Sequence, residues 1–290
     1  MSTPDAEALH EACRHAGLDC TGARPIRRHA NATYHLPAVH AVGRVGGSWD
    51  ASRRARTSLA VTRWLLARGF PSAEPLDVDQ PVDTGDRVVT FWRYYPPDPT
   101  HPPSTRDLAR LLRALHTAPH PPFPLRQYEP LRSFATALAA ARWLPAEDQQ
   151  FLEQRREQLL GQYAGLEFVL PTGLIHGDAD LGNLLRDRGT VRLGDWDGVC
   201  TGPREQDLAL THQAARFGAP PAQQQAFARE YGYDVTTWPG YPTLRDIHEL
   251  HTLTSFLRLA PTANGEVRHE LTRRIHTLRT SDHQTRWVAH

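Results

Sequence analysis

The chain has 290 residues, and its 33 Lys and Arg residues almost balance its 32 Asp and Glu residues. This length supports one large or two modest domains, and the balanced charge gives no reason to expect a nucleic acid as partner. No apolar run reaches membrane-spanning length and the N-terminus lacks a secretory signal, so we expect a cytoplasmic protein that does not bind a membrane.

The first part of the chain combines strand patterns with two helices. Thr3 and Pro4 open a helix that covers residues 5–16 and that Gly17 ends. A second, main helix is expected from Trp49 and Asp50 to residue 69. Extended segments lie on both sides of this main helix and indicate an antiparallel sheet. They cover residues 25–26, 34–36, 39–45, 76–78 and 87–92.

Prolines mark a boundary after position 95. Five prolines between residues 96 and 103 make a stiff crossing, so we divide the chain into an N-terminal domain, residues 1–95, and a C-terminal domain, residues 96–290. Ser104 and Asp107 form a capping box for a helix that extends to His116. The remainder is expected to be mostly helical. Its helices cover residues 131–143, 146–163, 223–231, 243–259 and 266–279.

One polar loop and the hairpin after it carry the chemistry. A short strand over residues 173–175 leads into a loop with Asp178 and, five residues later, Asn183. Residues 184–193 form a hairpin that returns the chain to the same place and brings Asp195 beside them. One carboxylate orients a hydroxyl and accepts its proton, while a carboxamide and a second carboxylate hold hard cations against phosphates. The pattern therefore indicates phosphoryl transfer from a metal-bound nucleotide.

The spacing of Asp178 and Asn183 equals that in the catalytic loop of protein kinases, and Asp195 falls where their second motif supplies an aspartate. The changed motifs, His-Gly-Asp at 176–178 and Gly-Asp-Trp-Asp at 194–197, resemble those of the aminoglycoside phosphotransferase and choline kinase superfamily. The resemblance covers nearly the whole chain and is most specific from His176 to Ala209. It implies an α+β, protein-kinase-like fold of two lobes. The N-terminal lobe is a small antiparallel sheet with one main helix, and the C-terminal lobe is larger and mostly helical.

The resemblance also implies roles for single residues. Asp178 would be the catalytic base on the acceptor hydroxyl, and Asn183 and Asp195 would hold Mg²⁺. ATP would be bound by Arg44 on its phosphates, by Asn31 in the loop over them, and by the hinge residues Phe91, Arg93 and Tyr94. His176 and Asp207 would support the catalytic loop. Asp180 and Asp197 flank the site and are expected to face a cationic acceptor.

Two features depart from the family pattern. An acidic residue on the main helix normally pairs with the phosphate-binding basic residue, but Ser58 stands at that position here. The positioning of Arg44 therefore lacks its usual partner, unless an acid from elsewhere, such as Asp50, substitutes for it. The connection over residues 29–33 contains no glycine, whereas protein kinases place a glycine-rich loop there.

The prediction is an ATP-dependent small-molecule kinase that phosphorylates a hydroxyl of an aminoglycoside, an amino sugar or a similar metabolite. A choline-like alcohol, homoserine or another antibiotic also stays open as acceptor, and so does GTP as donor. The alternative from another class is a nucleotide-binding regulator with little or no activity, which the serine at position 58 favours.

Metal-dependent hydrolysis is a weaker alternative. A dinuclear phosphatase could use alternating metal ligands such as His176, Asp178 and Asp180. It would also need further ligands at the positions that Leu184 and Leu185 occupy here. The pair formed by His248 and His251 is one residue short of the zinc-binding His-Glu-x-x-His spacing. Three cysteines without a Cys-x-x-Cys pair indicate neither a disulfide framework nor a zinc cage.

Overall fold

The structure is a computed structural model that describes residues 3–28, 31–47, 50–259 and 265–288. The chain forms two compact units. The first unit comprises Met1–Leu125 and Leu181–Val199, and the second comprises Arg126–Asp180 and Cys200–His290. The expected helix start at Trp49 and two residues of the expected phosphate loop, His29 and Ala30, lie outside the described residues.

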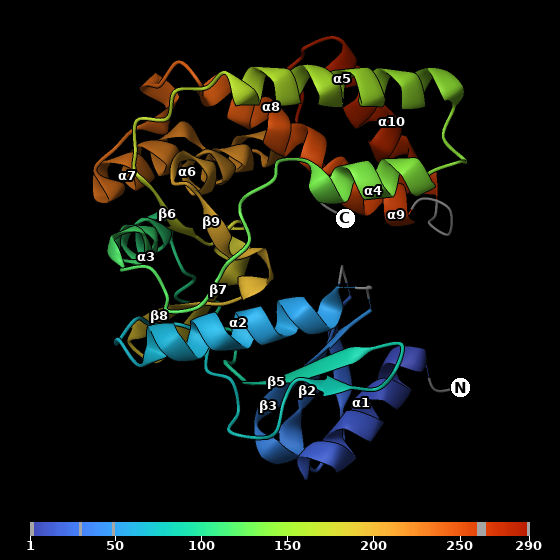
Figure 1. Ribbon diagram of the computed structural model, residues 1–290, viewed down its shortest axis with the longest axis vertical. Coiled ribbons are helices and arrows are strands. Elements are labelled where there is room, and N and C mark those ends of the chain that lie inside the picture. The colour runs from blue at the N-terminus through green and yellow to red at the C-terminus, as the bar shows by residue number, and fades with distance from the viewer. Residues whose placement is uncertain (1–2, 29–30, 48–49, 260–264, 289–290) are drawn as a thin grey trace. The chain divides into compact units, whose positions relative to one another are not determined.

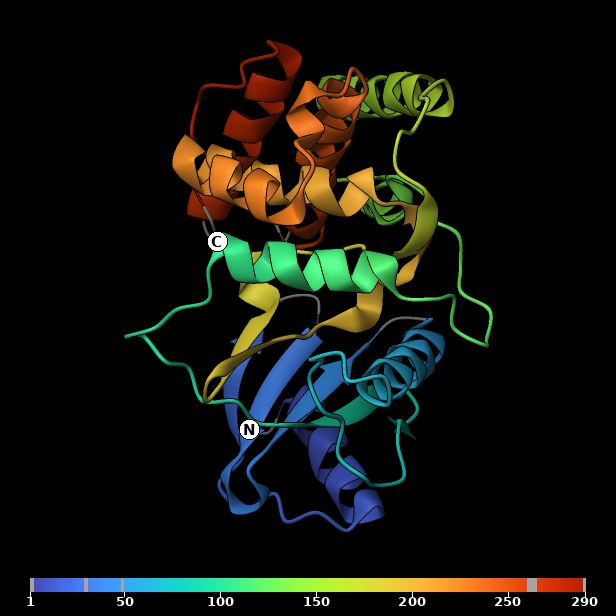
Figure 2. The same ribbon diagram turned by 90° about the vertical axis from the view of Figure 1, so that its left-hand side faces the viewer.

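The first unit is built on a five-stranded antiparallel sheet with the strand order β1-β2-β3-β5-β4 (Figure 1). Its strands are β1 Arg24–Arg28, β2 Asn31–Leu36, β3 Ala41–Gly46, β4 Val82–Asp83 and β5 Val88–Arg93. Helices α1 Pro4–Ala16 and α2 Ala51–Leu66 lie on opposite faces of this sheet (Figures 1 and 2). The predicted antiparallel sheet with one main helix is therefore confirmed.

Local chemistry explains where α1 begins and ends. The Thr3 hydroxyl accepts a hydrogen bond from the Ala6 N–H at 3.3 Å, and Pro4 occupies the first turn, where a missing N–H costs nothing. Gly17 adopts the left-handed conformation at φ 67° and donates its N–H to the Arg14 carbonyl. The buried residues Leu9 and Cys13 of this helix pack on the sheet.

Strand alternation divides the sheet residues between the two helices. Val45, Val89 and Phe91 point into the core beneath α1. Their neighbours in sequence point to the opposite face, because successive side chains of a strand alternate. Arg44 therefore lies on the α2 face, in line with its register partners Thr33 on β2 and Thr90 on β5. The polar side chains that contact Arg44 therefore lie on this α2 face of the sheet.

The strand expected over residues 76–78 is wrong. The segment before it forms one antiparallel bridge to β5, between Pro75 and Trp92, and the Gln80 amide then pairs with the backbone of Phe91. Gln80 Oε1 accepts the Phe91 N–H at 2.7 Å, and Gln80 Nε2 donates to the carbonyls of Phe91 at 3.3 Å and Leu76 at 2.7 Å. The short strand β4 follows this segment and pairs with Val88 and Val89.

The remainder of the first unit consists of α3 Thr105–Thr117 and the hairpin of β7 Leu184–Asp187 and β8 Thr190–Leu193. The predicted capping box of Ser104 and Asp107 is present at the start of α3. Ala73 donates its N–H to the Leu193 carbonyl at 2.9 Å, which fixes the hairpin to the segment before β4. The predicted domain boundary between residues 95 and 96 stays a prediction. In the structure, α3 and this hairpin, which both follow that boundary in sequence, belong to the first unit.

A closed ring of alternating charges also holds the hairpin. Arg93 contacts Glu74 at 3.0 Å and Asp187 at 3.2 Å, and Arg192 contacts the same two acids at 2.9 Å and 2.7 Å. Each acid therefore lies between two guanidinium groups. This ring connects β5, the hairpin and the segment before β4.

The second unit is mostly helical. Strand β6 Thr172–Ile175 pairs antiparallel with β9 Cys200–Pro203, a strand that the sequence does not predict. The expected helix over residues 243–259 is divided in two, because Thr252 ends the first part and bonds back to the Glu249 carbonyl. The helices are α4 Arg132–Ala140, α5 Ala146–Ala164, α6 Glu205–His212, α7 Pro221–Tyr231, α8 Tyr241–His251, α9 Leu253–Leu259 and α10 Gly265–Arg279. Among the described helices, none combines the length and the apolar character that spanning a bilayer requires.

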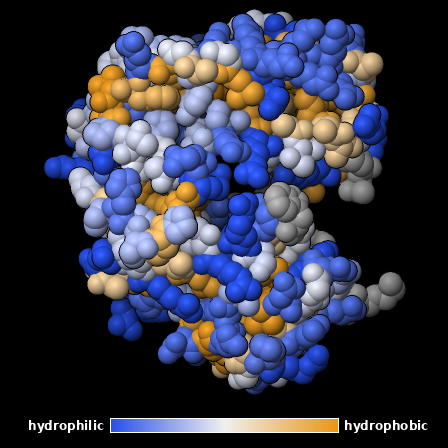
Figure 3. All heavy atoms as spheres, in the orientation of Figure 1, coloured by the Kyte–Doolittle hydropathy of each residue, from blue (hydrophilic) through white to orange (hydrophobic). Residues whose placement is uncertain are grey.

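Hydrophilic side chains cover most of the face shown in Figure 3, with apolar residues in separate groups between them. The large apolar side chains that are exposed in the described part of the chain come from six different segments. They are Ile26, Trp143, Val169, Phe217, Leu259 and Val288. Single exposed apolar residues are normal on a folded chain and carry no functional meaning.

The role of the Gln80 side chain is testable through stability. Replacing Gln80 with Leu leaves the buried N–H of Phe91 without its acceptor, so we expect a loss of about 1–3 kcal/mol in the free energy of unfolding. Urea denaturation followed by circular dichroism measures this loss. Gln225→Leu, at an exposed position of α7, is the matched control and should change the value by less than about 0.5 kcal/mol. Equal values for the two variants would contradict the role given to Gln80.

Candidate functional site

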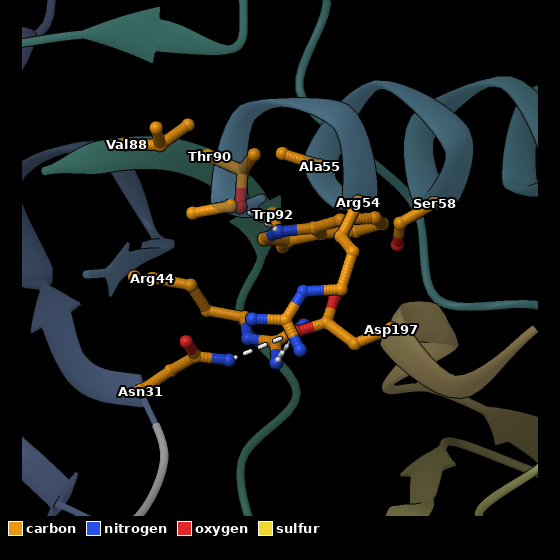
Figure 4. A pocket seen from close by; sticks show the side chains of 11 residues that line it. Asn31, Arg44, Arg54, Ala55, Ser58, Val88, Thr90, Trp92 and Asp197 are labelled. Atoms are coloured by element: carbon orange, nitrogen blue, oxygen red, sulfur yellow. Dashed lines mark hydrogen bonds and ion pairs between the residues drawn. The ribbon is translucent and has the colours of Figure 1, made fainter. Parts of the chain in front are cut away.

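The polar centre of the first unit is Arg44 on β3. Its Nη2 donates to Asp195 Oδ1 at 2.9 Å and to Asp197 Oδ2 at 3.1 Å. Asn31 on β2 donates its Nδ2 to the same Asp197 oxygen at 2.9 Å. Figure 4 shows Asn31, Arg44 and Asp197 pointing toward one another. The structure thus brings together four of the residues that the sequence analysis selects.

The turn that follows β8 places both acids on Arg44. Asp195 has a left-handed backbone at φ 59° and ψ 63°, which few residues other than glycine adopt. It leads into a short 3₁₀ helix, η3 Trp196–Gly198. The indole N–H of the fully buried Trp196 donates to the Ser72 hydroxyl at 2.8 Å and fixes this turn. The two carboxylates on either side of Trp196 are consequently held toward the sheet.

Electrostatics keep Arg44 charged. Burial disfavours a guanidinium charge, and 17% of the Arg44 side chain is exposed. The carboxylates of Asp197 and Asp195 outweigh this burial and hold the pKa of Arg44 above its ordinary value. The Arg44 guanidinium therefore faces two carboxylates, and a second guanidinium, that of Arg54, lines the same cavity.

A cavity lies between α2 and the polar face of the sheet (Figure 4). Ser58 is fully buried at its wall, where the family pattern expects an acid. Asp50, the substitute acid that the sequence analysis names, contacts Arg54 at 3.3 Å and Arg53 at 3.9 Å. The acids that the structure places on Arg44 come instead from the turn after β8.

The open end of the hairpin brings Asn183 close to Asp195. Gly194 donates its N–H to the Asn183 carbonyl at 2.8 Å, so the two predicted metal ligands are separated by one backbone hydrogen bond and one residue. A Cβ atom at Gly194 would lie 3.2 Å from Leu185 Cδ1, a close approach that a glycine avoids. An amide oxygen and a carboxylate are hard donors of the kind that Mg²⁺ and Ca²⁺ prefer, so this residue pair fits such a cation.

The expected hinge residues have their polar groups engaged within the first unit. The Phe91 side chain is buried in the core beneath α1, and its backbone pairs with Gln80. Arg93 belongs to the charged ring. Tyr94 donates its N–H to the His40 carbonyl at 3.0 Å. Their assignment to the nucleotide stays a prediction.

In the second unit, Asp207 on α6 holds the start of the loop that carries Asp178. Its Oδ2 accepts the His176 N–H at 2.7 Å and its Oδ1 accepts the Gly177 N–H at 2.8 Å. Gly177 has φ 78°, a conformation that favours glycine. Beyond it the side chains of Asp178 and Asp180 are exposed, while His176 is fully buried.

Glu205 is a second acid that fixes backbone N–H groups, and the sequence analysis assigns it no role. Glu205 is fully buried at the start of α6, and its Oε1 accepts the N–H groups of Val169 at 2.7 Å and Leu170 at 2.6 Å. This bond pattern fixes the chain before β6, as Asp207 fixes the chain after it. The available signal was an acid two positions before Asp207, and both acids lie in the first turn of α6.

The histidines of α8 do not form a metal site. Burial lowers the pKa of His248 to about 3, and its ring lies 3.1 Å from the Gln206 amide. Asp246, Glu249 and His283 form a cluster with suitable ligand atoms, but arginines already neutralise the acids. Arg155 contacts Asp246 at 2.6 Å, and Arg216 contacts Glu249 at 2.8 Å. A cation at this cluster would have to displace both arginines.

An antiparallel sheet with one main helix, together with a separate helical unit, defines a protein-kinase-like fold. The family model described as the phosphotransferase enzyme family matches residues 24–247. The chain belongs to the phosphotransferase enzyme family and is by class a small-molecule kinase. A search of curated proteins gives no match.

Solved structures of several kinases share this fold. Amicoumacin kinase hAmiN, in complex with AMP-PNP, Ca²⁺ and Ami, is 11% identical with a TM-score of 0.73, over 99% of this chain and 96% of that one. A microcompartment-associated aminopropanol kinase is 17% identical with a TM-score of 0.72, over 96% and 95% of the two chains. A choline/ethanolamine kinase family protein from Mesorhizobium loti is 18% identical with a TM-score of 0.62, over 94% of each chain.

The anchoring role of Asp207 is testable by hydrogen exchange. Asp207→Asn replaces one of the two accepting oxygens with an NH2 group, which cannot accept an N–H, so one of the two amides, His176 or Gly177, should exchange at least about tenfold faster. Mass spectrometry of peptides that cover the loop measures the rates. Asp234→Asn is the control, because that carboxylate bonds to Thr236 on an exposed turn. Unchanged exchange in the Asp207 variant would show that the loop is held by other contacts.

The buried, neutral His248 predicts a pH dependence of stability. Because the folded-state pKa is about 3 and the unfolded value is 6.5, the unfolded chain binds an additional proton between these values. Stability should therefore fall as the pH falls from 6.5 toward 3. His248→Gln should reduce this slope by up to about 1.4 kcal/mol per pH unit in urea denaturation, and His120→Gln, at an exposed position, should not.

Proposed function

We propose that this kinase transfers the γ-phosphoryl group of ATP to a hydroxyl group of a small, amine-bearing acceptor in the cytoplasm. The observation that carries the proposal is the turn after β8, which holds Asp195 both on Arg44 and next to Asn183. A phosphate-binding cation and two cation ligands thus lie within one unit. Family membership supports the same reaction.

The residues of the first unit would hold the nucleotide. Arg44 offers a planar fork of donors that matches two phosphate oxygens, whereas a lysine would act as a point charge. Asn183 and Asp195 are the residues that would bind Mg²⁺, and the bound cation would neutralise charge on the phosphates. Once Asp195 binds a cation, Arg44 has fewer anionic partners in the protein and is available to the phosphates.

Asp178 would act on the acceptor. Its carboxylate is exposed at the end of a loop whose start is fixed by Asp207, so it can accept a hydrogen bond from a hydroxyl and later its proton. Positioning contributes more than basicity in phosphoryl transfer, because the transition state is loose and the hydroxyl loses its proton late. His176 is buried and would support the loop that carries Asp178.

An amine-bearing acceptor is favoured by two observations. The exposed carboxylates of Asp178 and Asp180 attract a cation near the hydroxyl that reacts. Proteins of the same fold include an aminopropanol kinase and a choline/ethanolamine kinase family protein. Spectinomycin phosphotransferase, in complex with ADP and spectinomycin, also shares the fold. We therefore propose an amino alcohol, an amino sugar or an aminoglycoside, and a resistance role if the acceptor is an antibiotic.

A nucleotide-binding regulator without turnover is the second candidate. The buried serine at position 58 favours it, because the acid that usually holds the phosphate-binding residue is missing from α2. The regulator and the kinase predict the same nucleotide binding. They differ in whether an acceptor accelerates the release of ADP.

The deciding experiment measures ADP release from ATP and Mg²⁺ with pooled amino alcohols, amino sugars, aminoglycosides and neutral polyols. We expect release that depends on an amine-bearing pool and that falls about 10²–10⁴-fold in Asp178→Asn, which keeps the side-chain shape but cannot accept the proton. Turnover near normal in that variant would refute the catalytic assignment. Nucleotide binding without release in any pool would favour the regulator, and release with neutral polyols alone would refute the amine-bearing acceptor.

A further inference from the structure

We propose that Asp197 is the acid that positions Arg44, in place of the helix acid that this chain lacks at Ser58. The inference rests on the proposed function, because it gives Arg44 a nucleotide to bind. Asp197 is thus a positioning residue, which acts through Arg44 and has no direct contact with the reacting groups.

The other acids near Arg44 are less suited to this role. Asp50 stands at the start of α2 and contacts Arg53 and Arg54. Asp195 contacts Arg44 at 2.9 Å, but it lies next to Asn183 and would be the cation ligand. A carboxylate that binds a cation has less charge to offer a guanidinium. Asp197, at 3.1 Å, is the acid that can stay on Arg44 throughout the reaction.

Asn31 braces the Asp197 carboxylate from the neighbouring strand. Its Nδ2 donates to the same Asp197 oxygen that Arg44 contacts, so this oxygen is held from two strands. The residue opposite Asn31 is Gly46, and a Cβ atom there would lie 3.0 Å from Asn31 Oδ1. A glycine at this position leaves room for the Asn31 side chain. Asn31 and Gly46 therefore support the pair formed by Arg44 and Asp197.

The division of labour between the two acids has a measurable consequence. With Asp197 neutralised, Arg44 retains Asp195 as its charged partner, and the guanidinium then competes with the cation for that carboxylate. More Mg²⁺ is needed to occupy the site. A residue that only stabilises the fold would change the unfolding temperature without changing this cation requirement.

Ser58 offers a way to restore the usual arrangement. The side chain is fully buried at the wall of the cavity that Arg44 and Asp197 also line (Figure 4). Its hydroxyl has no hydrogen-bond partner among the described residues. A glutamate at this position places a carboxylate at the wall of the cavity that Arg44, Asp197 and Arg54 also line. It should replace the function of Asp197, whereas a glutamine of the same size should not.

The experiment compares Asp197→Asn, the double variant Ser58→Glu/Asp197→Asn and its matched control Ser58→Gln/Asp197→Asn with the unmodified protein. Calorimetric titration of ADP over a series of Mg²⁺ concentrations gives the half-saturating concentration of the cation. We expect this concentration to rise at least about tenfold in Asp197→Asn and to return to within about threefold of normal with glutamate at position 58. The KM for ATP should rise more than kcat falls.

The outcomes separate this inference from the proposed function. Unchanged cation dependence in Asp197→Asn, with normal binding by the unmodified protein, would overturn the role of Asp197 alone. Equal rescue by glutamine would overturn it too, because charge would not matter. If the unmodified protein binds no nucleotide with Mg²⁺, the proposed function falls and this inference with it. If Asp197→Asn does not fold, Asn31→Ala tests the same brace and should shift the cation dependence in the same direction.

Discussion

The pairing of Arg44 with the two acids of the turn after β8 is the constraint on which the first unit depends. It joins residues about 150 positions apart and ties the hairpin turn to the sheet. A partly buried guanidinium without a charged partner would lower the free energy of unfolding by several kcal/mol. The turn after β8 therefore stabilises the sheet through Arg44. The charged ring that contains Glu74 and Asp187 likewise pairs guanidinium groups with carboxylates, near the turn between β7 and β8.

In the proposed function, the same pairing keeps a nucleotide-binding site ready without its ligands. Arg44 faces two carboxylates, those of Asp195 and Asp197, and Arg54 of α2 lines the same cavity. A nucleotide with its cation brings both the positive charge that the acids need and the anion that Arg44 needs.

The fold was predictable to the extent that it depends on local chemistry. Pro4 and Gly17 delimit α1, and the hairpin of β7 and β8 follows from alternation around a tight turn. The strand expected over residues 76–78 is wrong, because the backbone there makes only a short bridge to β5 and the Gln80 side chain takes the Phe91 N–H, which no local pattern reveals. The pairing of β9 with β6 depends on residues far apart in sequence. In the site, the contact between Asp197 and Arg44 depends on the backbone at Asp195, which residue types alone do not specify.

The left-handed backbone at Asp195 limits which residues evolution can place there. Glycine, asparagine and aspartate tolerate this conformation, and of these three aspartate alone carries a charge. Glutamate would keep the charge but strain the main chain by about 1 kcal/mol or more. Two separate requirements therefore limit the residue at position 195. The left-handed backbone restricts the residue type, and the contact with Arg44 requires a negative charge. In the proposed function, loss of this carboxylate would remove a cation ligand and a partner of Arg44 at the same time.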